Sequence, residues 1–122
     1  MSSLIVAIAV FGALTALFML GGGVGKVTGQ PAMRESAQHF AIEWEHYRFL
    51  GVVEIAAAVG VVAGLWLTGV GLAAGVGVTA LMVGAVLYHA RFGDPAKRTV
   101  PALVALAVSA AYVALQTAAM WG

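Results

Sequence analysis

The sequence predicts an all-α membrane protein, a bundle of four transmembrane helices with one amphipathic helix at the membrane surface between spans 1 and 2. Hydrophobic residues make up 62% of the 122 residues and charged residues only 9%, whereas an average soluble domain has about 25% charged residues. The mean hydropathy is +1.01. Four apolar stretches each approach the length needed to cross a bilayer. The length suits a single membrane domain, residues 1–122.

The first predicted span covers about residues 4–20, LIVAIAVFGALTALFML, which form about 26 Å of helix. No basic segment precedes it, and Gly21-Gly22-Gly23 predicts a helix stop rather than a signal-peptide cleavage site. We therefore expect this span to remain in the mature protein. The following glycine-rich segment lacks the glycine and the Ser or Thr that a phosphate-binding loop requires, so it is interpreted as a flexible turn.

An amphipathic helix is predicted over about residues 32–48, with its aromatic residues at headgroup depth. One face carries apolar side chains, at Met33, Ala37, Phe40, Ala41 and Trp44. The opposite stripe is polar and contains Glu35, His39, Glu43 and His46. Glu43-x-x-His46 has the spacing used in di-iron bundles, but the second such motif is missing, so no metal site is predicted. Two histidines and a carboxylate would still suffice for zinc.

The second and third spans are predicted at about 49–67 and 72–90, joined by a very tight turn at 68–71. So short a link makes these spans antiparallel neighbours. Small residues recur at the spacing that allows close helix packing. They are Gly60 with Gly64, Gly71 with Gly75, and Ala80 with Gly84. These faces could pack within the bundle or join copies into a homo-oligomer.

The fourth span is predicted at about 102–120, after a polar loop at 91–101. Its polar residues Ser109, Tyr112 and Gln116 lie on one helical face, and we expect that face to look into the bundle. For Ser109 the alternative is a hydroxyl that bonds its own helix backbone.

The basic residues predict the topology. They lie only in the first and third loops, at Lys26, Arg34, Arg48, Arg91, Lys97 and Arg98. The positive-inside rule places both loops in the cytoplasm and both termini outside a cell membrane. A formal net charge of +1 without a basic stripe gives no support for a nucleic-acid partner. The chain has no cysteine, which excludes disulfides and thiolate metal sites within it.

Glu54 is the main candidate catalytic residue, because an ionisable side chain within a membrane span indicates a functional site. It lies six helical positions, about 9 Å, beyond Arg48. His89 approaches the same membrane surface from the third span. Glu54 and His89 could share a proton and titrate as a coupled acid/base pair, or form a structural pair that fixes helix register.

Several short motifs together resemble the DoxX-like family of small four-helix membrane proteins. They are Gly25-Lys26, Gly51-x-x-Glu54, Tyr88-His89 and Asp94. The resemblance implies a four-helix fold. It also implies an association with quinone-linked oxidation of sulfur compounds and with membrane redox complexes.

Three functions are compatible with these features. The first is binding of a quinone or other isoprenoid-like ligand, beside a redox partner protein. The second is a small enzyme that performs isomerisation, epoxide opening or cyclisation on a lipophilic substrate, with Glu54 as acid or base and His89 tuning it. The third is a scaffold that forms oligomers. The predicted binding residues are Tyr47, Gly51, Tyr88, Glu43, His46, Ser109 and Tyr112.

Overall fold

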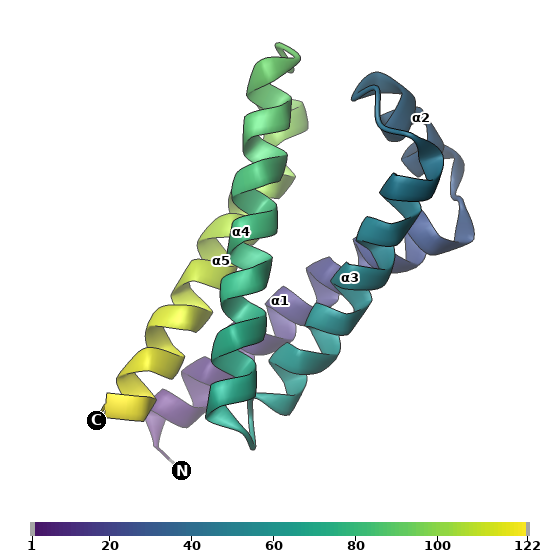
Figure 1. Cartoon of the computed structure of the whole chain (residues 1–122). Coiled ribbons are helices and arrows are strands. Elements are labelled where there is room, and N and C mark those ends of the chain that lie inside the picture. Colours follow the sequence, from purple (N-terminus) through teal and green to yellow (C-terminus); the bar gives the residue numbers. More distant parts are fainter. Residues whose placement is uncertain (1, 122) are drawn as a thin grey trace.

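The computed structural model describes residues 2–121, and within that range every regular element is a helix (Figure 1). The helices are α1 (Ser3–Thr28), α2 (Pro31–His39), α3 (Trp44–Ala63), α4 (Thr68–Arg91) and α5 (Ala96–Trp121). All but α2 are long and apolar enough to cross a membrane. The predicted fold class, an all-α bundle with four candidate spans, is confirmed.

The first helix is longer than the sequence indicated. The predicted stop at Gly21–Gly23 is wrong, because α1 continues through these glycines to Thr28. Two of them, Gly22 and Gly23, pack closely on α3: a Cβ atom on Gly23 would lie 2.8 Å from the carbonyl oxygen of Gly51. The helix ends instead at Gly29, whose φ of 73° is the left-handed conformation that glycine adopts readily at a helix C-terminus.

The predicted helix over 32–48 is divided into two. Helix α2 ends at His39, and Ala41 has a φ of 55°, so the chain turns before α3 begins at Trp44. The amide of Ile42 donates to the Ala37 carbonyl and the amide of Ala41 to that of Gln38, which is a Schellman motif. Glu43 and His46 therefore do not continue the polar stripe that includes His39.

Two other boundaries also move. The turn between the second and third spans lies at 64–67 rather than 68–71, and α5 begins at Ala96 with Pro101 inside it. The spans α3 and α4 are nevertheless antiparallel neighbours, as predicted (Figure 1). Gly64 and Gly71 face each other so closely that a Cβ on either would clash with the other's Cα.

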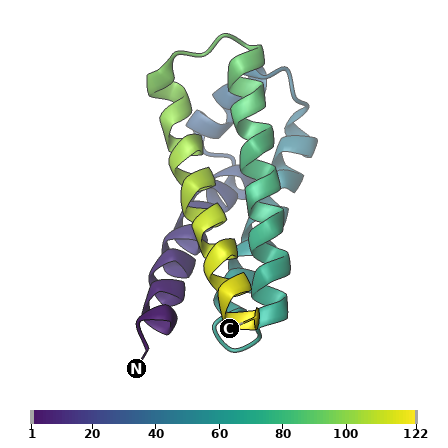
Figure 2. The ribbon, with the colours of Figure 1, turned by 90° about the vertical axis from the view of Figure 1, so that its left-hand side faces the viewer.

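The bundle consists of two helix pairs that diverge toward one end. Helix α1 packs mainly on α3, and α4 packs mainly on α5. We name the end with both termini and the 64–67 turn the closed end, and the end with α2 and the 92–95 loop the polar end. The pairs meet at the closed end and separate toward the polar end (Figure 1). Figure 2 shows α4 and α5 side by side in front of the other pair. The hydrophobic core comprises Ile8, Ala16, Met19, Ala58, Val61, Val78 and Tyr112.

Polar side chains of α5 bind the last turn of α3 near the closed end. The Tyr112 hydroxyl donates to the Val61 carbonyl at 2.8 Å, and Gln116 Nε2 donates to the Gly64 carbonyl at 2.9 Å. The last carbonyls of a helix have no partner within it, and hydrocarbon offers none. Tyr112 and Gln116 therefore satisfy the end of α3. The prediction that the polar face of the fourth span looks into the bundle is confirmed.

Candidate functional site

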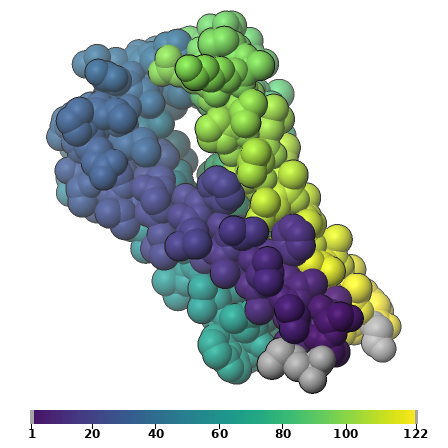
Figure 3. Space-filling view, turned by 180° about the vertical axis from the view of Figure 1, so that it is seen from behind, coloured from purple at the N-terminus to yellow at the C-terminus, as the bar shows by residue number. Residues whose placement is uncertain are grey.

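A cavity of about 830 Å³ lies between the two helix pairs toward the polar end. Small residues on α4 leave this space open: a Cβ on Gly77 or Gly84 would meet no atom within 4 Å. Figure 3 shows the opening between α5 and the first third of the chain. Most of the lining is apolar. Its polar members are Lys26, Ser36, Tyr47, Glu54, Tyr88, His89 and Arg98.

Glu54 forms an ion pair with Lys26 on the α1–α3 wall of this cavity. The distance from Lys26 Nζ to Glu54 Oε1 is 2.8 Å, and the side chains are only 12% and 8% exposed. The Lys26 ammonium also lies 5.0 Å from the centre of the Tyr47 ring. A buried carboxylate needs such a partner, because an unpaired charge in an apolar medium is very costly.

Glycines allow this ion pair to form. A Cβ on Gly22 would lie 2.6 Å from Glu54 Oε2, and one on Gly51 would lie 2.6 Å from Lys26 Cβ. Gly51, predicted as a binding residue, packs beneath the pair. The predicted helix stop assigned Lys26 to a loop, which is why the sequence did not identify it as the partner of Glu54.

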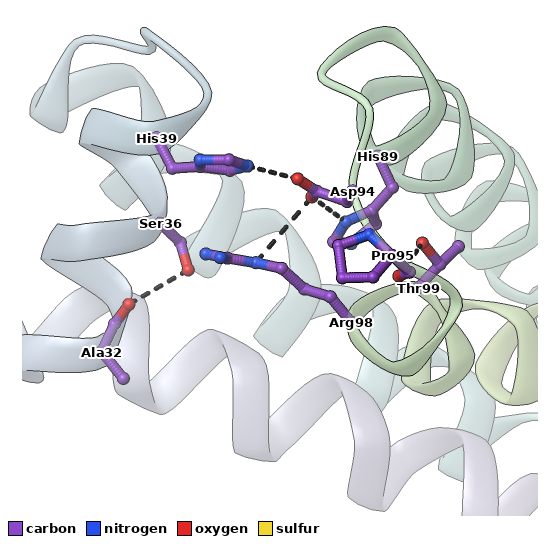
Figure 4. A network of polar contacts seen from close by, with 8 residues as sticks. All are labelled: Ala32, Ser36, His39, His89, Asp94, Pro95, Arg98 and Thr99. Atoms are coloured by element: carbon purple, nitrogen blue, oxygen red, sulfur yellow. Dashed lines mark hydrogen bonds and ion pairs between the residues drawn. The ribbon is translucent and has the colours of Figure 1, made fainter.

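His89 bonds to Asp94 rather than to Glu54. His89 Nδ1 lies 2.6 Å from Asp94 Oδ2, and His39 Nε2 of α2 lies 2.6 Å from Asp94 Oδ1 (Figure 4). We name His39, Asp94 and His89 the latch, because they join α2 to the α4–α5 loop. Glu54 and His89 line the same cavity, but each has a different ionic partner.

The carboxyl group of Asp94 is 3% exposed. Desolvation raises its pKa, but the hydrogen bonds from His89 and His39 and the charges of His39 and Arg98 outweigh that effect. The pKa of Asp94 therefore lies below its usual range. An ionised carboxylate is the form that accepts both histidine bonds.

An aromatic cluster covers the latch. The Phe40 ring lies edge-on to His89, Tyr88 and Phe92, with centroids 5.2, 5.7 and 5.6 Å away. Edge-to-face packing at such distances is favourable. The segment after α2 is thus packed on the end of α4, above the cavity.

The other predicted site residues fall into two groups. Glu43 and His46 pair with each other at 3.5 Å, with 80% and 75% of their side chains exposed, and they do not line the cavity. Ser109 and Tyr112 lie in the core, where Ser109 donates to the Leu106 carbonyl and accepts from Thr79. Within residues 2–121, no group of three His, Asp or Glu side chains is placed to bind a metal ion.

The DoxX-like family matches residues 10–112, a range that contains the cavity, the Lys26–Glu54 pair and the latch. The chain belongs to the DoxX-like family. This DoxX-like protein is also 36% identical over 74 residues to an uncharacterized protein, YdgD, of Bacillus subtilis (strain 168). That match covers 61% of this chain and 65% of the relative, just under two thirds of its length. No solved structure matches this chain.

Family membership and four candidate spans identify a multi-pass membrane protein. Its apolar outer surface contacts the lipid bilayer. Large hydrophobic side chains such as Leu17, Val59 and Leu87 are more than half exposed in the isolated chain, as expected of helices that face hydrocarbon.

Proposed function

We propose that this DoxX-like protein binds a lipophilic small molecule, a quinone or another isoprenoid-like compound, in the cavity between its helix pairs. The supporting observation is the cavity itself. Its volume of about 830 Å³ falls within the range of about 300–1,000 Å³ for small-molecule sites, which are mostly apolar with few polar groups. The polar groups gather near one end, which suits an amphiphilic ligand with a single head.

The Lys26–Glu54 pair suits both redox states of a quinone. An ammonium group has three N–H donors, and the 2.8 Å bond to Glu54 uses one of them. Lys26 can therefore donate to a quinone carbonyl. The Glu54 carboxylate can accept a bond from the hydroxyl of a quinol. Tyr47 and Tyr88, which also line the cavity, would pack against the ring.

By the positive-inside rule, the basic residues at the polar end support an orientation in which the cavity mouth lies in the cytoplasmic half of a cell membrane and both termini lie outside. The ligand head would then lie near the cytoplasmic surface, and its tail would extend between the diverging helix pairs. A redox partner protein would reach the head from the cytoplasm. We therefore expect the protein to act as a membrane subunit of a redox complex.

The test compares two glycines of α4. A Cβ on Gly84 or Gly69 would meet no atom within 4 Å, but only Gly84 lines the cavity. Gly84→Leu should place a side chain inside the cavity and Gly69→Leu should not. Native mass spectrometry of gently solubilised protein, with an added quinone, should show ligand on the wild type and on Gly69→Leu and clearly less on Gly84→Leu. Equal retention by all three, or binding by none, would contradict the proposal.

A second candidate is acid/base catalysis on a lipophilic substrate, favoured by the position of the Glu54 carboxylate on the cavity wall. Lys26, rather than His89, would then set the protonation of Glu54. Glu54→Gln cannot exchange a proton but keeps the shape of the side chain. Conversion of a bound lipophile at the wild-type rate by Glu54→Gln would exclude this function.

A scaffold function through the small-residue faces receives less support. A Cβ on Gly60 would lie 2.8 Å from the Cβ of Ala74, and Gly64 packs on Gly71. These glycines join α3 to α4 within one chain. A homo-oligomer would use another surface.

A further inference from the structure

Both carboxylates near the cavity already have close partners. Glu54 is bound by Lys26 at 2.8 Å. Each oxygen of Asp94 lies 2.6 Å from a histidine nitrogen. The closest partners of these two carboxylates are therefore Lys26, His39 and His89, and Arg98 is only a more distant ionic neighbour of Asp94.

Arg98, on the first turn of α5, lines the cavity and has no carboxylate of the described chain within hydrogen-bond distance. Its Nε atom lies 3.8 Å from Asp94 Oδ2, longer than a hydrogen bond, and that oxygen already accepts from His89. Within residues 2–121 its terminal guanidinium nitrogens make no hydrogen bond to protein. The side chain is 45% exposed and lines the cavity. Figure 4 shows it extending below the latch toward Ser36 of α2.

We propose that Arg98 is a head-group binding residue and that the cavity prefers amphiphiles with an acidic head, a carboxylate or a phosphate. This inference rests on the proposed function and, within its ligand class, favours isoprenoid-like compounds with an acidic head over a quinone. A guanidinium group presents its N–H donors in a planar fork that matches two oxygens of a carboxylate or phosphate. The largely apolar cavity walls below Arg98 would hold the hydrocarbon chain of the bound amphiphile.

The experiment uses probes that share one chain and differ in the head. The full protein is placed in phosphatidylcholine nanodiscs and given oleate, oleyl phosphate or oleyl alcohol, and the bound molecule is counted by native mass spectrometry. We expect the wild type to retain one or both acidic probes roughly tenfold better than the alcohol, the ratio that about 1.4 kcal/mol produces. Whichever acidic probe is retained better identifies the head.

Arg98→Gln should lose the preference for acidic probes, but it should still bind oleate, oleyl phosphate and oleyl alcohol. Arg98→Lys, which keeps the charge without the fork, should keep part of it. Arg91→Gln is the matched control, because Arg91 also lies in the basic loop region but does not line the cavity. It should behave as the wild type. Circular dichroism and size exclusion confirm that each variant is folded.

The outcomes separate this inference from the proposed function. Equal retention of acid and alcohol by the wild type would overturn the inference and leave the lipophile site standing. An acid preference that survives Arg98→Gln would also overturn it. If the wild type retains none of the three probes, the inference fails, and the measurement with an added quinone decides separately whether the lipophile site stands.

Discussion

His39 and Asp94 are joined by a 2.6 Å hydrogen bond although 55 positions separate them in the sequence. This bond connects α2, at the end of the α1–α3 pair, to the loop that follows α4. It bridges the two helix pairs where they are farthest apart (Figure 1). The latch therefore decides how firmly α2 covers the polar end of the cavity.

Removing the latch donor should loosen α2. His39→Ala deletes the bond to Asp94 and the ring contact with Phe40, so amides of residues 31–42 should exchange with deuterium several-fold faster. Hydrogen exchange with mass spectrometry measures this. His46→Ala, at a 75% exposed side chain, is the control and should leave exchange unchanged. Unaltered exchange in His39→Ala would show that other contacts hold α2.

Acid should open the latch through Asp94. Its pKa is lowered in the folded protein relative to the unfolded value of about 3.9. The stabilisation is therefore complete above about pH 3.9 and is lost as the pH falls through the lower, folded value. Hydrogen exchange of residues 31–42 should show an acid step in that window in the wild type. Asp94→Asn does not ionise and should show no such step.

The Lys26–Glu54 pair should be costly to break from one side. Lys26→Met leaves the Glu54 carboxylate buried without a partner. We therefore expect the free energy of unfolding to fall by about 3–5 kcal/mol. Lys26→Met combined with Glu54→Gln removes both charges and should recover much of that loss. Denaturant unfolding in detergent micelles gives the free energy of unfolding of the wild type, the single variant and the double variant. A double variant no more stable than Lys26→Met would contradict the explanation that the loss comes from an unpaired buried carboxylate at Glu54.

The hydroxyl of Tyr112 should contribute to stability. Tyr112→Phe leaves the Val61 carbonyl, at the end of α3, without its donor, and should cost about 2 kcal/mol in the same unfolding measurement. Tyr88→Phe is the matched control, since Tyr88 is 41% exposed and its hydroxyl makes no hydrogen bond within the described chain. Equal stabilities of the two variants would contradict the role assigned to Tyr112.

The contact between α3 and α4 should not tolerate a methyl group at Gly64. A Cβ there would clash with the backbone of Gly71 and with the Tyr112 hydroxyl, and Gly64→Ala should cost about 3 kcal/mol. Gly69→Ala adds the same methyl where no atom lies within 4 Å. It should be neutral or slightly stabilising, since alanine favours the helix. Thermal unfolding in detergent distinguishes the two variants.

Hydropathy and charge predicted the four candidate spans, because a helix that crosses lipid must be apolar and must contain few charged residues. A span needs about 20 apolar residues, and four such stretches were present. The spacing of Ser109, Tyr112 and Gln116 gave the buried face of α5 for the same reason, since polar groups in hydrocarbon must turn inward. The motifs around Glu54 and His89 were enough to suggest the family.

The sequence did not predict the partners within the site. Gly21–Gly23 has the local signature of a helix end, and only the tertiary contact with Gly51 shows why glycines continue the helix there. That extension carries Lys26 to Glu54. The latch depends on Ala41 adopting a left-handed conformation, which alanine seldom does, so the break between α2 and α3 had no signal in the pattern. Without that break, His39 could not be placed beside Asp94.

The position of the Tyr112 and Gln116 bonds near one end of the molecule has a mechanical consequence. Gly75 packs on Tyr112, and His89 lies 14 residues, about 21 Å, farther along α4. If the helix pairs rotate by about 10° around the Tyr112 contact, the end of α4 moves by about 4 Å. A displacement of that size exceeds the reach of a hydrogen bond. A small change in angle at the contact beside Gly75 would thus be enough to make or break the His39–Asp94 bond.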